Sequence, residues 1–199
     1  MEGTIELKFI RPVGDDITSP GGEFGATRHY GPHKGVDFKS RLRTDVRASE
    51  RGEVVCSVLR EGSKEKTNYG NVIVIDHTPE ADPDQRHIYT LYAHLDYRGV
   101  YRGQKVRKEE TIGRSGNSGT RQSYSGKPKE KQKDYHLHFE LIDSLRKLVW
   151  DGGNWHPLSL RKDPMNGYIG STLTIDYDRT GGQISRAGLS SRYEPFYRL

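Results

Sequence analysis

The run 134–141, Asp-Tyr-His-Leu-His-Phe-Glu-Leu, places the strongest constraint on what this chain can fold into. Apolar and polar residues alternate along it, and a period of two residues is typical of a β-strand with one buried face. Successive side chains of a strand point to opposite faces, so His136 and His138 share one face and the apolar residues form a core face. Two imidazoles side by side suit a metal site, or one metal ligand beside a catalytic base.

Other alternating or apolar runs recur along the chain, and turn residues separate them. No long segment shows a convincing period of 3.6 residues, so the sequence predicts a mainly β fold with an antiparallel sheet and long polar loops. Hydrophobic residues make up only 32% of the chain, which agrees with a modest core inside such loops. Strands are expected near residues 35–39, 52–59, 71–77, 87–94, 104–106, 111–114, 136–142 and 146–150.

The length of 199 residues suits one domain with appendages. We expect an N-terminal extension over residues 1–19, whose run at 4–10 is a candidate edge strand, and a central domain over 20–160. A C-terminal appendage follows over 161–199, with a candidate strand at 170–177. The insertion at 121–134 is polar and basic, and two interpretations stay open: a solvated loop, or a substrate-facing loop that contacts acidic groups.

Charge and cysteine content narrow the function less than the motifs do. The net charge of +5 favours polyanions, whether nucleic acid, anionic lipid or cell-wall polymers, and charge does not choose among them. The single cysteine, Cys56, cannot form an internal disulfide, and we expect it to be a small buried side chain. The first 20 residues lack the pattern of a secretory signal, and no run of 18 apolar residues predicts a transmembrane helix.

Candidate metal ligands stand in the run 31–38, Gly-Pro-His-Lys-Gly-Val-Asp-Phe. His33 and Asp37 offer a nitrogen and an oxygen to zinc, and a catalytic zinc site takes three protein ligands and a water. One histidine of the later pair completes the three, and spacing alone leaves the roles of that pair interchangeable. His29, four residues before His33, is a rival ligand, and His94 ends another apolar run.

Taken in order, these motifs resemble the LytM/lysostaphin-type zinc metallopeptidases of peptidase family M23, which cut peptidoglycan. The resemblance rests on His-x-x-x-Asp at 33–37, Tyr-Ala-His-Leu at 92–95 and His-Leu-His-Phe-Glu at 136–140. It extends over roughly residues 20 to 143, and three further segments support it: the strand at 70–77, the turn at 103–106 and the glycine loop at 112–120.

The resemblance implies a role for each site residue. The second histidine of the pair binds zinc in this family, so His33, Asp37 and His138 are the expected ligands, and His94 and His136 are the expected catalytic residues. Zinc lowers the pKa of a bound water from about 16 towards about 7. The two catalytic histidines would then move its proton and stabilise the oxyanion, and which of them is the base stays open. The other candidates are expected to be structural or surface residues: His77, His87 and His156.

The expected activity is that of a zinc-dependent endopeptidase on the peptidoglycan stem or cross-bridge, at the bacterial cell wall or periplasm. We expect a monomer with no nucleic-acid partner and no membrane span. Because no secretory signal is evident, the protein would reach the wall as part of a phage particle, through a dedicated secretion system or after lysis, unless a leader has been removed from this sequence. One alternative is a non-catalytic zinc-binding cell-wall module or amidase activator. A basic nucleic-acid-binding β protein would explain the charge but not the histidine motifs.

Overall fold

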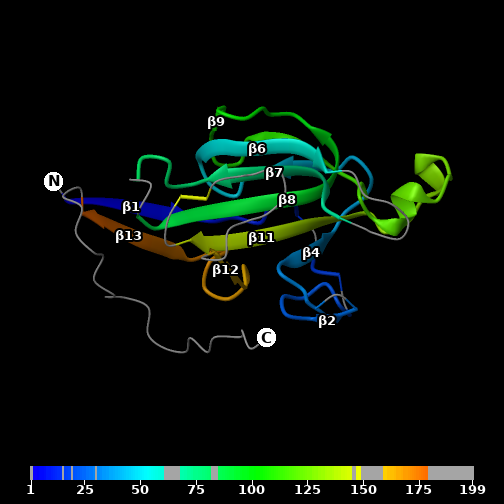
Figure 1. Cartoon of the computed structure of the whole chain (residues 1–199), viewed down its shortest axis with the longest axis horizontal. Helices are drawn as coiled ribbons and strands as arrows, with labels where there is room; N and C mark the ends of the chain where they lie inside the picture. Colours follow the sequence, from blue (N-terminus) through cyan, green and yellow to red (C-terminus); the bar gives the residue numbers. More distant parts are fainter. Residues whose placement is uncertain are drawn as a thin grey trace.

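The computed structural model confirms a mainly β, antiparallel architecture (Figure 1). The residues that it describes are 2–14, 16–18, 20–29, 31–60, 68–81, 85–144, 147–148 and 159–178. Among these residues, no helix has the length and apolar character that crossing a membrane requires.

One large antiparallel sheet dominates the described part of the chain, and its long strands lie side by side in Figure 1. Strand β8 is central, between β7 and β11, and the main path runs β12-β11-β8-β7-β6-β9. The bounds are β6 (Gly52–Arg60), β7 (Gly70–Asp76), β8 (His87–Arg98), β9 (Lys105–Val106), β11 (His136–Ser144) and β12 (Ser159–Lys162).

Shorter strands complete the sheet beside the start of β11 and beside the end of β8. β4 (Val36–Lys39) pairs with residues 136–139 of β11, and β10 (Thr111–Ser115) pairs with both β8 and β5 (Asp45–Arg47). A separate ladder joins β2 (Thr27–Arg28) to β3 (Gly31–Pro32). The start of β11 therefore lies between β4 on one side and β8 on the other.

The core lies on the apolar face of β11, as the alternation predicts. Leu137 and Phe139 are fully buried, and the Phe139 ring packs against Tyr92 and Phe38 with centroid distances of 5.3 and 6.1 Å. Burying an aromatic side chain of this size contributes about 1.5–3 kcal/mol, so this face anchors the strand. Cys56 is also buried, as expected.

The predicted strands from 35–39 to 136–142 are confirmed, although β8 extends to Arg98 because its polar end pairs with β10. The strand expected at 146–150 falls mostly outside the described residues, and residues 147–148 belong to no strand.

Both ends of the described chain contribute strands. β1 (Glu2–Lys8) pairs with β13 (Thr172–Asp178) in a two-stranded sheet, at the left of Figure 1, so the candidate strands at 4–10 and 170–177 are observed. β12 crosses residue 160 and pairs with β11 in the main sheet. The division into extension, domain and appendage stays a prediction.

Candidate metal centre and catalytic histidines

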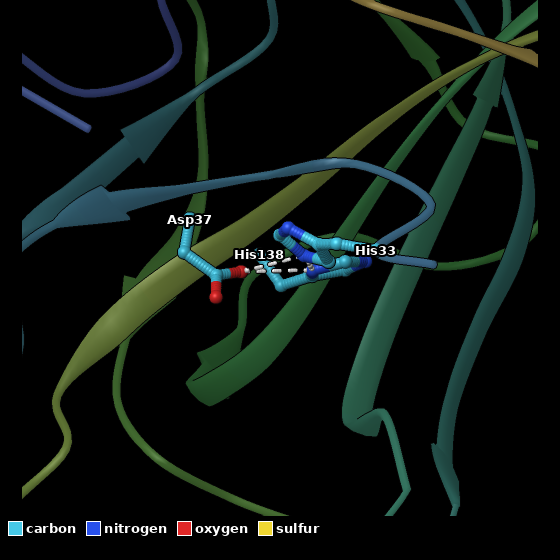
Figure 2. A group of neighbouring side chains, drawn as sticks. All are labelled: His33, Asp37 and His138. Atoms are coloured by element: carbon cyan, nitrogen blue, oxygen red, sulfur yellow. Dashed lines mark hydrogen bonds and ion pairs between the residues drawn. The ribbon is translucent and has the colours of Figure 1, made fainter. Parts of the chain in front are cut away.

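The three predicted metal ligands meet where β4 lies against β11. The register of these strands places Asp37 directly opposite His138, and His33 lies in the loop that leads into β4. Figure 2 shows the Asp37 carboxylate and the His33 ring directed towards His138. Nδ1 of His138 lies 2.9 Å from Oδ1 of Asp37 and 2.9 Å from Nε2 of His33. The remaining distance, from Nε2 of His33 to Oδ1 of Asp37, is 3.2 Å.

Hydrogen bonds on the far side of two ligands fix which atoms face the centre. The carbonyl oxygen of Glu23 can only accept, so Nδ1–H of His33 donates to it at 2.9 Å and Nε2 keeps its lone pair. The Arg28 guanidinium donates to Oδ2 of Asp37 at 2.6 Å, which leaves Oδ1 towards the centre. Such outer partners are typical of metal sites, because they orient the ligands before the ion binds.

His138 is oriented in the same way by Glu140, which lies two residues further along the same face of β11. Nε2–H of His138 donates to Oε1 of Glu140 at 3.0 Å, so Nδ1 is the ring nitrogen that faces Asp37 and His33. Glu140 is fully buried and also accepts hydrogen bonds from the Tyr69 hydroxyl and from Nε of Arg161, each at 2.6 Å. Burial alone would raise the pKa of Glu140, but the bond from His138 and the charge of Arg161 lower it to about 2.

The donor set fits a metal ion. With the outer hydrogen bonds made, Nε2 of His33, Oδ1 of Asp37 and Nδ1 of His138 are three acceptors within 4.8 Å of one another, and all three residues are buried. Converging buried acceptors require a cation, and two imidazoles with one carboxylate are a zinc set. Burial alone would lower the pKa of His138, yet the bonds to Asp37 and Glu140 raise it to about 9. A proton on Nδ1 therefore meets the demand for positive charge beside Asp37, and a metal ion bound at Nδ1 would displace that proton.

His94 reaches the site through an irregularity in β8. Pairing between β7 and β8 changes register around it, and its φ of 59° lies in the left-handed region that few non-glycine residues adopt. A bulge of this kind turns a side chain to a new direction, and strained backbone is concentrated at functional sites. Nδ1–H of His94 donates to the carbonyl of Ser118 at 2.8 Å, so Nε2 presents a lone pair. Burial and the neighbouring histidines hold the pKa of His94 well below its usual value.

The glycine loop at 112–120 holds the Ser118 carbonyl in place. A Cβ at Gly70 would lie 2.3 Å from backbone atoms of Ser118, and a Cβ at Gly119 would lie 2.3 Å from the carbonyl oxygen of Asn68. The close approach of the two chain segments therefore depends on these glycines, and through the Ser118 carbonyl the loop orients His94.

His136 completes the group at the start of β11. Its Nδ1–H donates to the carbonyl of Asp134 at 2.8 Å, which again leaves the lone pair on Nε2. The ring centroids of His94 and His136 are 4.7 Å apart, and Nε2 of His136 lies 3.8 Å from Oδ1 of Asp37. Burial lowers the pKa of His136. The five predicted site residues thus lie together, with two imidazoles beside the three acceptors.

Comparison with known proteins identifies the family. The sequence model of peptidase family M23 matches residues 31–149. The chain belongs to peptidase family M23. Five predicted site residues and Glu140 lie inside the match, whereas Arg28 and Arg161 lie outside it.

Individual relatives of this M23 chain agree with the assignment. Over 116 residues the chain is 33% identical to the peptidoglycan DD-endopeptidase ShyA of Vibrio cholerae, a stretch that covers 58% of this chain and 21% of that protein. A zinc-containing peptidase from Vibrio cholerae superposes with a TM-score of 0.52 at 27% identity, over 71% of this chain and 38% of the other. Lysostaphin from Staphylococcus simulans superposes with a TM-score of 0.50 at 23% identity, over 79% of this chain and 52% of lysostaphin.

The other histidines of this M23 chain that the structure describes lie outside the group of three candidate ligands. His77 is buried and bonds the carbonyl of Arg51 and the hydroxyl of Thr90, and His87 is buried against Asp76. Within the described residues, His29 is not part of the ligand group. His156 lies outside the described residues.

The basic insertion lies beside the two histidines that are candidate catalytic residues. It carries two short 3-10 helices, η1 (Arg121–Tyr124) and η2 (Lys129–Lys131), which project at the right of Figure 1. Lys129 pairs with Asp96, and Asn117 donates to Gln132 and to the carbonyl of Lys133, so these contacts tie it to the sheet. Its role in contacting substrate stays a prediction.

Four residues that orient the site were not predicted from the sequence: Arg28, Tyr69, Glu140 and Arg161. Glu140 had a signal, because residues i and i+2 of a strand share a face and His138 was already a candidate ligand. Arg161 had none, since its contact with Glu140 depends on how β12 is placed.

Proposed function

We propose that this M23 member is a zinc-dependent endopeptidase that hydrolyses peptide bonds in the peptidoglycan stem or cross-bridge. The observation that carries the proposal is the group of three convergent acceptors from His33, Asp37 and His138, with two further imidazoles at its edge. The peptidoglycan substrate is supported by the relative ShyA, a DD-endopeptidase, although the aligned region covers 21% of that protein.

In this proposal, Nε2 of His33, Oδ1 of Asp37 and Nδ1 of His138 hold the zinc ion. Zinc supplies Lewis acidity, which lowers the pKa of a water molecule and polarises the scissile carbonyl. The chain supplies the orientation of the ligands. Glu23, Arg28 and Glu140 bind the far sides of the three ligands and keep the inner atoms directed at one point.

His94 and His136 act on protons. Each has Nδ1–H bound to a backbone carbonyl, so each presents Nε2 towards the space beside the ligands. Their ring centroids are 4.7 Å apart, so a proton on one ring disfavours a proton on the other. The pair therefore takes up at most one proton at Nε2: the unprotonated ring is free to act as the base, and the other ring acts as a donor when it is protonated. The base takes the proton of the attacking water and returns it to the leaving amine, and the donor stabilises the oxyanion.

The place of action and the domain assignment follow from the same proposal. We assign the peptidase domain to residues 20–160, acting as a monomer at the cell wall or periplasm. The insertion at 121–134 carries exposed basic side chains and ends two residues before His136, which supports a contact with acidic groups of the wall.

The test combines metal analysis with digestion of a defined substrate. Purified protein should hold about one zinc per chain, and it should release peptide fragments from purified peptidoglycan, whose masses identify the cleaved bond. His138→Ala should lose both zinc and cleavage. His94→Asn should keep zinc and lose cleavage. Zinc binding without any fragment from several peptidoglycan types would indicate a non-catalytic wall module, and the absence of both properties would refute the proposal.

A further inference from the structure

A buried carboxylate behind His138 is held from a strand outside the family match. Glu140 is fully buried, and its two oxygens have different partners. Oε1 accepts from Nε2–H of His138 and from the Tyr69 hydroxyl, whereas Oε2 accepts from Nε of Arg161 at 2.6 Å. Each oxygen of the carboxylate is therefore bound in a fixed direction.

The position of Arg161 depends on β12. Arg161 pairs with Ile142 in the ladder between β12 and β11, so its backbone lies next to the strand that carries both Glu140 and His138. Its side chain is 15% exposed, and a guanidinium that is mostly removed from water binds a carboxylate strongly and directionally. The family match ends at residue 149, so this contact comes from a part of the chain beyond it.

We propose that Arg161 is a positioning residue for the metal centre: it holds the Glu140 carboxylate, which in turn holds His138 with Nδ1 directed at the metal. The inference rests on the proposed zinc site. Outer partners of this kind fix both the tautomer and the ring orientation of a ligating histidine.

Loss of Arg161 should weaken zinc binding without removing a ligand. Without the guanidinium, Oε2 has lost its anchor, and the carboxylate can turn away from Nε2–H of His138. The imidazole then samples other orientations and binds zinc less tightly. Replacement of outer-shell partners typically lowers metal affinity by about 10–100-fold, and we expect Arg161→Met to fall in that range.

The chain contains a matched control pair, Arg86 with Asp143, whose carboxylate lies on β11 as that of Glu140 does. Arg86 binds Asp143 of β11 with Nε–Oδ1 and Nη2–Oδ2 distances of 2.8 and 2.9 Å, and its side chain is 17% exposed. The Arg86 and Arg161 side chains are therefore similarly buried, and each binds a carboxylate of β11. The two pairs differ in that His138 bonds Glu140 and not Asp143. Arg86→Met should destabilise the fold and leave the zinc dissociation constant within about twofold.

The experiment measures the zinc dissociation constant of the full chain by competition with a chromogenic chelator, together with the Tm of the chelated protein. Arg161→Met should raise the constant by about 10–100-fold, and Arg161→Lys, which keeps the charge, should restore part of the affinity. Tyr69→Phe removes one hydrogen bond to Oε1 and should weaken zinc binding by a few-fold.

Equal effects of Arg161→Met and Arg86→Met on the constant would overturn the inference, and so would unchanged or tighter binding by Arg161→Met. If Arg161→Met does not fold, Arg161→Lys and Tyr69→Phe decide, and wild-type affinity in both would overturn it. Wild-type protein without zinc affinity would refute the proposed function as well, whereas a zinc-binding wild type with unaffected variants would refute this inference alone.

Discussion

Gly35 separates two of the proposed ligands, His33 and Asp37, and it lies against the strand that carries the third. A Cβ added at Gly35 would lie 2.3 Å from the carbonyl oxygen of Phe139 and 2.9 Å from Cγ of Glu140. The obstacle is backbone, so no rotation of a side chain removes it. Gly35→Ala should therefore push the start of β4 away from β11.

The size of the effect follows from that contact. Because a Cβ is essentially never found closer than 3.0 Å, the 2.3 Å contact must open by about 0.7 Å. Ligand distances in a metal site tolerate only about 0.2 Å, so His33 and Asp37 no longer match His138. Overpacking costs about 1–3 kcal/mol. If bringing the strands back around zinc requires the same free energy, the dissociation constant rises roughly 5- to 150-fold.

Two measurements check this prediction: the zinc dissociation constant by chelator competition, and the Tm of the chelated protein. For a chain of this size 1 kcal/mol corresponds to about 2–4 °C, so Gly35→Ala should lower the Tm by about 2–12 °C. Gly14→Ala is the control, because its added Cβ meets no atom within 4 Å. Wild-type zinc affinity in Gly35→Ala, or an equal loss of affinity in Gly14→Ala, would refute the proposed separation of β4 from β11.

Three further predictions concern the metal, the catalytic histidines and acid stability. Zinc at 100 times its dissociation constant should raise the Tm by about 5–11 °C through about 2.7 kcal/mol of linkage, and a shift retained in His138→Ala would contradict the ligand assignment. His94→Asn should lower the cleavage rate by about 10²–10⁴-fold with little change in Tm, because asparagine tolerates the φ of 59°, and near-wild-type cleavage would exclude a catalytic role. Burial lowers the pKa of His77 to about 4 in the folded protein. As the pH falls below about 6.5, His77 is therefore protonated in the unfolded chain before it is protonated in the folded one. Stability should fall by about 2 kcal/mol between pH 8 and pH 5 through this group, and urea unfolding of His77→Gln should show a shallower pH dependence than the wild type.

The mainly β fold and the five candidate residues could be predicted from the sequence for local reasons. The two-residue period of 136–141 places the histidines on one face and Leu137 with Phe139 on the other, and the structure agrees. His33, Asp37 and His94 were found because the motifs stand in a recognisable order. The orienting contacts could not be found in this way, since Arg28 and Arg161 belong to other strands and only packing decides which carboxylate each one meets.

By itself, then, the sequence determined the face of each strand residue and the set of side chains available for the site. The tertiary structure decided how those side chains meet. Register is one such decision: Asp37 lies opposite His138, and a slip of one residue would turn the β4 carboxylate to the core face. The backbone conformation of His94 is another. It lies where the pairing of β8 with β7 and with β10 is irregular, and the sequence of one strand alone does not specify such an irregularity. Both depend on long-range pairing, which period and composition do not contain.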